Sequence, residues 1–347
     1  MRTIRLGRTN LVVSEIGFGG IPIQRLTTEE AVAVVRRCLD LGVTFLDTAH
    51  GYTTSEERIG QAIAGRREGL VLASKSPARD GATFVEHLEL SLKRLGVSSI
   101  DIYQFHGVST PQDYERILAP GGPLDRAREA QAAGRIGHIG ITTHSLALAQ
   151  EFVRSGHFET VMFPFNFIST EPETALLPLC RAHDVALLAM KPMGGGVFED
   201  ARPAFHYLRQ FPDVLPVVGI ENVREIEEIV ALTEEPAELA PEDAAEIARL
   251  RRELGTRFCR RCDYCQPCPQ GIAISTVLSL RGFSRRFPRE RVFGSWGQEI
   301  IRTAQTCQEC GECESRCPYN LAIRDLLKEA IAWYESALAA YIAAKSG

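Results

Sequence analysis

Short apolar runs alternate with amphipathic segments along roughly the first 235 residues. Six of the amphipathic segments carry apolar residues at three- and four-residue spacing, which is typical of helices that bury one face: Thr28–Leu41, Ser55–Ala64, Thr83–Leu95, Leu124–Ala133, Leu146–Ser155 and Val223–Leu232. The apolar runs have the length of buried strands: Glu15–Phe18, Thr44–Asp47, Leu70–Ser74, Ile100–Phe105, His138–Ile141, Thr160–Phe163, Ala186–Met190 and Val214–Val218. This alternation predicts parallel strands joined by helices.

Eight strand–helix units in this length favour a (β/α)8 TIM barrel. The alternative is an open doubly wound sheet, which usually carries a GxGxxG motif after its first strand. The first glycine cluster, GFGGIPI at residues 17–23, lacks that spacing, so the barrel is preferred. Thr3–Leu6 and Leu11–Val13 predict a hairpin that closes the bottom of the barrel. The segment Val108–Pro123 is expected to be a loop beside the pocket.

The sequence predicts three parts. Residues 1–235 form the barrel, residues 236–255 a linker and helix after a Pro- and Glu-rich seam, and residues 256–347 a cysteine-rich α-helical domain. A hydrophobic content of 45% and a charged content of 24% are ordinary for a globular protein. There is no signal-peptide core and no apolar run of about 18 residues, so we expect a cytoplasmic protein without a membrane partner. A net charge of -5 gives no reason to expect a nucleic-acid partner.

Ionisable side chains follow three successive predicted strands, at the end where the active site of such a barrel lies. Asp47 ends one strand and is followed by Tyr52, Lys75 ends the next, and His106 ends the third. A phenol has an ordinary pKa of about 10, which a nearby ammonium lowers. We therefore predict that Tyr52 donates a proton, tuned by Lys75 and Asp47, beside a histidine that binds a substrate oxygen. Taken singly, each residue is more often a cap, a rim charge or a packing residue.

The sequence around these residues resembles the aldo-keto reductase family. LGRTNLVVSEIGFGG at residues 6–20 is similar to that family's hairpin and first strand, and FLDTAHGY at residues 45–52 carries its Asp-x4-Tyr element. The contexts of Lys75 and His106 supply the remaining two members of the family's tetrad. The resemblance implies a barrel that reduces aldehydes or ketones with NADH or NADPH, and with Tyr52 as the general acid.

The same resemblance implies cofactor contacts at the ends of the later strands. GITTHS at residues 140–145 is similar to the segment that holds the nicotinamide carboxamide. Met162 stands where a glutamine is common, and Met190 where an aromatic ring often stacks under the nicotinamide. The implied cofactor-binding residues are Gly20, Ile21, Thr142, Thr143, Asn166, Met190, Lys191, Gly219, Asn222 and Glu225.

PVVGIENVREIEEIV at residues 216–230 resembles the turn that binds the adenosine ribose. Glu221 and Glu225 lie at or near positions where NADPH-using members place basic residues. A carboxylate would repel a 2'-phosphate and accept a hydrogen bond from a 2'-hydroxyl, so we expect a preference for NADH. The alternative is that both glutamates are exposed charges favoured by the dipole at a helix start.

Eight of the ten cysteines lie between residues 259 and 317, apart from Cys38 and Cys180. A disulfide framework would be spread through the fold, so this clustering favours metal binding by reduced thiols. Repeated x2 spacings that end in Cys-Pro are typical of ferredoxins and favour two [4Fe–4S] clusters over zinc. The second motif matches this pattern in full, whereas the first is one residue short before its fourth cysteine.

In two-cluster ferredoxins the fourth cysteine of each motif ligates the other cluster. This predicts two crossed ligand sets: Cys259, Cys262, Cys265 and Cys317 for one cluster, and Cys307, Cys310, Cys313 and Cys268 for the other. The alternative is that each motif closes on its own cluster. Arginines are dense around the motifs, which indicates either a solvated basic face or a docking patch for an acidic electron carrier: Arg257, Arg260, Arg261, Arg281, Arg285, Arg286, Arg289 and Arg291.

Aldo-keto reductases with a C-terminal ferredoxin-like domain are known, and this chain resembles that subfamily over nearly its whole length. The resemblance implies an oxidoreductase that interconverts a small-molecule carbonyl and an alcohol with NAD(P)H. Its clusters would relay electrons, with a protein carrier as partner, or support the fold. The alternative is an electron-transfer or redox-sensing protein whose barrel binds nicotinamide without carbonyl turnover.

Overall fold

The computed structural model describes residues 1–346 and divides the chain into two compact units, residues 1–244 and 245–347. Gly347, the last residue of the predicted cysteine-rich domain, lies outside the described residues. The boundary between the units falls inside helix α11 (Pro241–Leu254). Each unit has its own hydrophobic core, and each is described below by itself.

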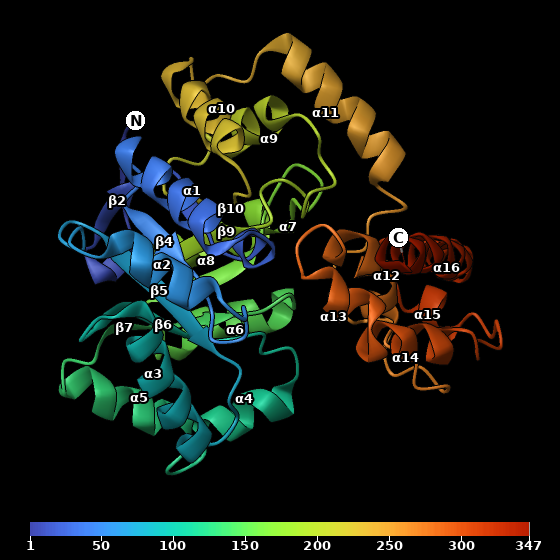
Figure 1. The fold of residues 1–347 in the computed structure, drawn as a ribbon, viewed down its shortest axis with the longest axis horizontal. Coiled ribbons are helices and arrows are strands. Elements are labelled where there is room, and N and C mark those ends of the chain that lie inside the picture. The colour runs from blue at the N-terminus through green and yellow to red at the C-terminus, as the bar shows by residue number, and fades with distance from the viewer. Residues whose placement is uncertain (347) are drawn as a thin grey trace. The chain divides into compact units, whose positions relative to one another are not determined.

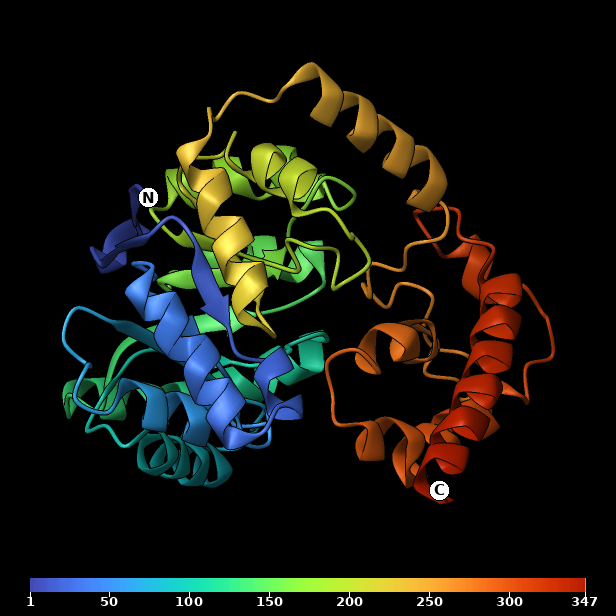
Figure 2. The same cartoon turned by 45° about the horizontal axis from the view of Figure 1, so that its top comes forward.

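The first unit is a closed barrel of parallel strands in the order β10-β3-β4-β5-β6-β7-β8-β9, with helices around the outside (Figures 1 and 2). This confirms the predicted (β/α)8 fold. Each strand overlaps one predicted apolar run: β3 (Gly17–Gly19), β4 (Phe45–Asp47), β5 (Val71–Ser76), β6 (Ile100–Phe105), β7 (Ile136–Thr142), β8 (Thr160–Pro164), β9 (Ala186–Met190) and β10 (Val214–Gly219).

The six predicted helices are present as α1 (Thr28–Asp40), α2 (Ser55–Ile63), α3 (Gly81–Leu95), α5 (Pro123–Ala132), α6 (Leu146–Ser155) and α10 (Val223–Glu234). Four short helices were not predicted: α4 (Pro111–Leu118), α7 (Glu171–Ala175), α8 (Leu177–Ala182) and α9 (Ala201–Leu208). Helix α4 corrects the expectation of a plain loop at residues 108–123. The Thr110 side chain accepts a hydrogen bond from the Asp113 amide, and Pro111 occupies the first helical position, so a cap and a proline start this helix.

An N-terminal hairpin closes one end of the barrel, as predicted. Strand β1 (Thr3–Arg5) pairs antiparallel with β2 (Val12–Ser14), and the short 3-10 helix η1 (Gly7–Thr9) joins them. Ile4 and Val13 are buried in the same cluster as barrel residues from β4, β5 and β6. The Arg8 amide donates to the carbonyl of Asp184, just before β9 begins, so the hairpin lies at the N-terminal ends of the strands.

The barrel interior explains which polar residues reach the opposite rim. Phe45, Ala73 and Ile102 belong to the interior cluster. Successive side chains of a strand point to opposite faces, so residues two positions further along face inward as well. In β4 and β5 these positions are occupied by Asp47 and Lys75. A second 3-10 helix, η2 (Pro22–Arg25), follows β3 at this rim.

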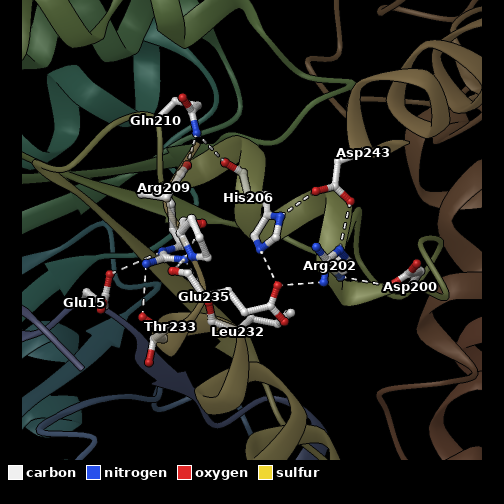
Figure 3. A network of polar contacts seen from close by, with 12 residues as sticks. Glu15, Asp200, Arg202, His206, Arg209, Gln210, Leu232, Thr233, Glu235 and Asp243 are labelled. Atoms are coloured by element: carbon white, nitrogen blue, oxygen red, sulfur yellow. Dashed lines mark hydrogen bonds and ion pairs between the residues drawn. The ribbon is translucent and has the colours of Figure 1, made fainter. Parts of the chain in front are cut away.

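Polar side chains of α9 hold the segment that leads out of the barrel (Figure 3). The Arg209 guanidinium, just past the end of α9, donates to carbonyl oxygens at and beyond the C-terminus of α10, which the helix leaves without intrahelical partners. His206 Nδ1 lies 2.5 Å from Asp243 Oδ2 in the first turn of α11, and Arg202 bridges Glu235 and Asp243. The start of α11 is therefore fixed on α9 by buried and half-buried charges.

The second unit is helical, as predicted. It contains α12 (Ile274–Phe283), α13 (Arg289–Phe293), α14 (Ser295–Ala304), α15 (Glu312–Ser315) and the long α16 (Ile323–Ser346). Val277, Leu280 and Phe293 form its core with Tyr334, whose hydroxyl donates to the Val292 carbonyl at 2.9 Å. Among the described residues, no helix combines the length and hydrophobicity needed to cross a bilayer.

Candidate active site and candidate iron–sulfur centre

Lys75 and Asp47 form a buried ion pair at the C-terminal rim of the barrel. Lys75 Nζ donates to Asp47 Oδ2 at 2.6 Å and to the Thr48 carbonyl at 2.6 Å. Both side chains are almost fully excluded from solvent, at 1% and 5% exposure. A buried charge is costly unless it is paired and hydrogen-bonded, so this geometry keeps the ammonium in a fixed position.

Tyr52 and His106 complete the predicted group of four. Tyr52 lies in the turn after β4, and Lys75 Nζ is 5.0 Å from the centre of its ring. His106 directly follows β6, and its ring meets the Tyr52 ring edge-on with centroids 5.6 Å apart. Tyr52 and His106 are half-buried, whereas the ion pair is buried. The structure thus brings all four predicted residues together at one rim.

The charges of this site hold the lysine in its ammonium form. Burial alone would lower the pKa of Lys75, but the carboxylate of Asp47 outweighs it, and Tyr52 acts in the same direction through charge and a hydrogen bond. The pKa of Lys75 is therefore raised above its ordinary value. A permanent positive charge beside Tyr52 favours its phenolate and so makes the phenol a better acid.

Sequence reasoning missed two groups that hold this site together. Gln104 Nε2 donates to the second carboxylate oxygen of Asp47 at 3.1 Å, and the Thr48 carbonyl accepts from Lys75. Gln104 lies on the inward face of β6, two positions after Ile102. A polar residue at an interior position of an apolar strand was the signal that could have found it.

A second polar layer lies behind Lys75, on the outer face of β5. Ser74 Oγ donates to the buried carboxylate of Glu56 at 2.6 Å, and Arg94 from α3 reaches the same carboxylate at 3.3 Å. The rings of His50 and His87 stack at 3.7 Å. Burial lowers the pKa of His50 to about 4, with His87 and Arg94 adding to the effect. The turn that carries His50 and Tyr52 is thus packed against His87 of α3, and burial also lowers the pKa of His87.

The predicted cofactor residues Gly20, Ile21 and Gly219 lie next to one another where β3 and β10 end. A Cβ atom on Gly20 would lie 2.6 Å from Ser55 Oγ, and one on Gly219 would lie 2.9 Å from the Pro22 ring. The backbone at this rim is therefore packed too tightly for larger side chains. Glycine has no side chain, so a ligand can lie close to the backbone at such positions.

Thr142, Thr143 and Asn166 are all buried, and their side chains are partly engaged. Thr142 Oγ1 accepts from the Gly107 amide at 2.8 Å, and Thr143 Oγ1 accepts from the Ser145 amide at 3.0 Å. Both hydroxyl groups keep a proton to donate. Asn166 Nδ2 donates to the Lys191 carbonyl at 2.9 Å, which ties the end of β8 to the turn after β9.

The turn after β9 has a glycine-rich backbone. Met190 ends the strand, half-buried against the interior cluster, and Lys191 has a positive φ of 57°. Gly194 also has a positive φ, and a Cβ atom there would collide with the Phe198 ring at 2.7 Å. Phe198 stacks on Phe167 with centroids 4.2 Å apart, which anchors the turn.

The two glutamates near the predicted ribose site differ in what they do. Glu225 and Asn222 form a capping box at the start of α10, and Glu225 also accepts from the Glu221 amide at 2.7 Å. Its carboxylate is therefore engaged with the helix start. Glu221 lies 3.4 Å from Arg25, and burial raises the pKa of Glu221 although Arg25 opposes the effect.

In the second unit, one predicted set of cysteines is coupled through its charges. Burial first, and then the nearby Cys259 and Cys317, raise the pKa of Cys262 to about 11. Burial and the charges of Cys259 and Cys262 contribute to raising the pKa of Cys265 to about 12. Cys317 thus lies close to cysteines of the first motif, although it belongs to the second.

A pocket in the second unit is lined by the other predicted set, Cys268 with Cys307, Cys310 and Cys313, and Cys265 also borders it. Arg316 donates to the Pro267 carbonyl at 2.8 Å and joins the two motifs. Cys310 is exposed to solvent, Cys265 is buried, and the other three are half-buried. In residues 1–346, no three His, Cys, Asp or Glu side chains are arranged to hold a single metal ion. Thiols of both motifs line this one pocket, and a [4Fe–4S] cluster is held by four thiolates.

The two remaining cysteines, Cys38 and Cys180, are buried in the barrel unit. Burial raises the pKa of each thiol to about 12. A thiol that stays protonated is a poor nucleophile and a poor metal ligand, so both are packing residues.

Comparison with known sequences identifies the two parts of the chain. A family model described as the Aldo/keto reductase family matches residues 15–210, and one described as a 4Fe-4S dicluster domain matches residues 258–322. The uncharacterized oxidoreductase YqkF of Bacillus subtilis is 29% identical over 216 residues, which cover 58% of this chain and 67% of that protein. The NADH-specific methylglyoxal reductase of Escherichia coli is 27% identical over 230 residues, 57% of this chain and 69% of that protein.

Another curated relative is matched over only 61% of its own length. Among solved structures, an aldo-keto reductase from Klebsiella pneumoniae in complex with NADPH superimposes with a TM-score of 0.62 at 24% identity. The superposition covers 72% of this chain and 94% of that one. This likeness shows the shared barrel fold.

Proposed function

Because the chain belongs to the aldo/keto reductase family and carries a 4Fe-4S dicluster domain, we propose that it interconverts a small-molecule carbonyl and an alcohol with NAD(P)H, and that two [4Fe–4S] clusters exchange electrons with a protein carrier. The observation that carries the proposal is the buried Lys75–Asp47 pair beside the half-buried Tyr52. Such an arrangement has a cost that a purely structural site would avoid. It supports carbonyl turnover over nicotinamide sensing, because a sensor has less need of a proton donor.

In the proposed reduction, Tyr52 Oη gives its proton to the carbonyl oxygen of the substrate. The phenolate that remains is stabilised by the Lys75 ammonium, whose position is fixed by Asp47 and the Thr48 carbonyl. General acid catalysis of this kind contributes about 10²–10⁴-fold to a rate. His106, which touches the edge of the Tyr52 ring, is placed to donate a hydrogen bond to the same oxygen.

The nicotinamide, when bound, supplies the hydride for the carbonyl carbon. We assign Thr142, Thr143 and Asn166 to its carboxamide, since they lie at or just past the ends of β7 and β8 and each keeps a proton to donate. Gly20 and Gly219 have no side chain to keep the cofactor away from the backbone, and Ile21 lies between Gly20 and the start of η2. Met190 would pack under the ring, and the turn that begins with Lys191 would meet the pyrophosphate, with Asn222 and Glu225 shaping the helix start near the ribose.

We further propose a preference for NADH that rests on Glu221. Its carboxylate is half-buried and would repel a 2'-phosphate, and the Arg25 guanidinium 3.4 Å away offsets part of that repulsion. One relative is named as NADH-specific and one structural neighbour contains NADPH, so both cofactors occur in barrels of this kind. Glu221→Gln should raise kcat/KM for NADPH without a matching gain for NADH. An equal change for both cofactors, or a wild type that prefers NADPH, would contradict this assignment.

When bound, the clusters supply one-electron transfer. We assign Cys259, Cys262, Cys265 and Cys317 to the first cluster and the other four cysteines to the second. The charge coupling between Cys262 and Cys317 and the pocket shared by Cys268 with the second motif support this crossed pairing.

The test uses protein purified without oxygen. Iron and acid-labile sulfide should each approach eight per chain, and reduction should produce the EPR signals of two clusters. The same sample should oxidise NADH or NADPH in the presence of one or more members of an aldehyde and ketone panel. Zinc in place of iron would overturn the cluster proposal. If iron-loaded protein turns over no aldehyde or ketone of the panel, the reductase proposal is wrong.

A further inference from the structure

The two units carry opposite charge. Residues 1–244 contain 33 acidic and 23 basic side chains, whereas residues 245–347 contain 11 acidic and 16 basic ones. The excess of positive charge in the second unit is concentrated in one short segment. Residues 281–291 hold five arginines and a single glutamate.

Three of these arginines present their charge to solvent. Arg281 lies in the last turn of α12, Arg289 and Arg291 lie on α13, and all three are exposed. Across the described chain, no carboxylate forms an ion pair with any of the three, whereas Glu290 is 3.9 Å from Lys345. Most other exposed arginines of this unit, such as Arg302 beside Glu299, are neutralised by a neighbour. The charges of Arg281, Arg289 and Arg291 are therefore available to a binding partner.

Aromatic rings lie among these charges. Trp296 is 38% exposed, and the Arg291 guanidinium lies 5.7 Å from its ring and 4.8 Å from the Phe287 ring. Phe283 packs against both rings, with centroids 5.2 and 6.2 Å away. Arginine and tryptophan are the residues most enriched among interface hot spots, and a rigid aromatic base reduces the entropy lost when an arginine is bound.

This basic aromatic face is joined to the first set of cysteines by direct packing. Arg261 is the neighbour of Cys262 in the chain, and its guanidinium lies 5.0 Å from the Phe283 ring. Phe283 and Cys259 pack against the same hydrophobic core. A partner bound at Arg281, Arg289, Arg291 and Trp296 would thus contact Trp296, which packs on Phe283. Phe283 in turn contacts Arg261, which is next to Cys262 of the first cluster site.

We propose that this face is the docking site for a small redox protein with an acidic surface around its redox centre. The inference rests on the proposed function, which supplies the clusters. In the exchange, one electron passes between a cluster of the second unit and the one-electron centre of the partner, and no bond or proton is transferred. Complementary charge steers such an encounter and fixes its orientation.

The test uses the anaerobic, iron-loaded full chain and flavodoxin as an acidic probe. Binding to oxidised flavodoxin is measured by calorimetry from about 20 to about 300 mM NaCl, and electron transfer from the dithionite-reduced chain by stopped flow. The variant Arg281→Glu/Arg289→Glu/Arg291→Glu removes the face. Arg116→Glu/Arg128→Glu/Arg154→Glu makes the same change in net charge at exposed arginines of the barrel.

We expect the wild-type Kd to rise at least about tenfold over this salt range, and the face variant to weaken binding by a similar factor at low salt. The barrel variant should bind nearly as well as the wild type. Trp296→Ala should weaken binding with little effect on its salt dependence. Equal losses in both triple variants, or a face variant that binds like the wild type, would overturn the proposal. So would binding to single-stranded RNA or to anionic phosphatidylserine vesicles that is tighter than to flavodoxin.

Failure of this inference can be told apart from failure of the proposed function. Iron, sulfide and EPR measurements on wild type and face variant report the clusters, and they should be identical. If iron is absent, the proposed function fails, while the Kd for flavodoxin still decides whether the face binds an acidic protein.

Discussion

The two units prepare their chemistry in opposite ways. In the barrel, Lys75 and Asp47 are buried, paired at 2.6 Å and held on two neighbouring strands. In the second unit, the cysteines are mostly half-buried, Cys310 is exposed, and the thiols line a pocket. The strands of the barrel fix the positions of Lys75 and Asp47. In the second unit the fold brings the cysteines near one another, and we expect a bound cluster to fix their final positions.

This difference indicates that the two units are stabilised in different ways. The barrel buries apolar residues from eight strands around the reactive groups, so its core does not depend on the site. The second unit packs five of its partly buried cysteines against the cluster of its core residues, and Cys265 belongs to that cluster. Its core and its proposed metal ligands therefore belong to one structure, so we expect metal binding to contribute to its free energy of folding.

Removal of the clusters should have the largest effect on folding stability, and it should affect the second unit and not the barrel. Structural metal sites contribute on the order of 10 kcal/mol to folding. We expect iron chelation under oxidising conditions to abolish amide protection in α12 and α14 while the barrel strands keep theirs, as measured by hydrogen exchange. Equal loss of protection in both units, or none in α12 and α14, would break the comparison.

Lys75→Met tests the other side of the comparison. It leaves Asp47 as a buried charge without its partner, which should destabilise the barrel by about 3–5 kcal/mol in urea unfolding. Turnover should fall by about 10²–10⁴-fold because Tyr52 loses the charge that makes it an acid.

The double variant Asp47→Asn/Lys75→Met serves as the matched control. It removes the uncompensated charge, so most of the stability should return while turnover stays low. If the single variant is as stable as the wild type, the pair does not organise this site.

The crossed ligand sets give a more local prediction. Cys317→Ser should remove the EPR signal of the first cluster, and Cys268→Ser that of the second, although each residue lies in the other motif. A chain truncated just before Cys307 should lose both clusters, because each needs a ligand from the second motif. Loss of the second signal in Cys317→Ser would show that each motif closes on itself.

The smallest effect concerns the His50–His87 stack. Both imidazoles have pKa values lowered by burial, that of His50 to about 4, so the unfolded chain binds more protons than the folded one between pH about 6.5 and 4. Stability is complete above pH 6.5 and should fall by roughly 1 kcal/mol towards pH 4, a modest amount because both rings are partly exposed.

Urea unfolding at several pH values measures this slope. His50→Gln/His87→Gln should flatten it, whereas His183→Gln, at an exposed histidine, should leave it unchanged. An unaltered slope in the double variant would place the titrating groups elsewhere.

The parts of this fold that follow a local period could be predicted from the sequence. The eight strands and six main helices were predicted because apolar spacing repeats within each element. Helices α4, α7, α8 and α9 are short and begin at or near prolines, so they offer too few turns for a periodic signal. The capping box of Asn222 and Glu225 has a sequence signature that indicates a helix start, and it was not used.

The grouping of the candidate active-site residues could be predicted because parallel strands end at one rim. Asp47, Lys75 and His106 follow three neighbouring strands, so their encounter needed only the barrel. The contacts of Glu56 with Ser74 and Arg94 come from α2, β5 and α3, and no spacing in the sequence brings them together. Tertiary packing alone determines such a layer.

The central claim is that the barrel reduces carbonyls through Tyr52, and Tyr52→Phe tests it most directly. Steady-state reduction of the best aldehyde or ketone of the panel and the Kd for the nicotinamide are measured on the same iron-loaded sample. We predict that kcat falls by at least about 10²-fold while the Kd stays within about twofold, because the phenol supplies only the proton. Turnover that survives in Tyr52→Phe would contradict the account.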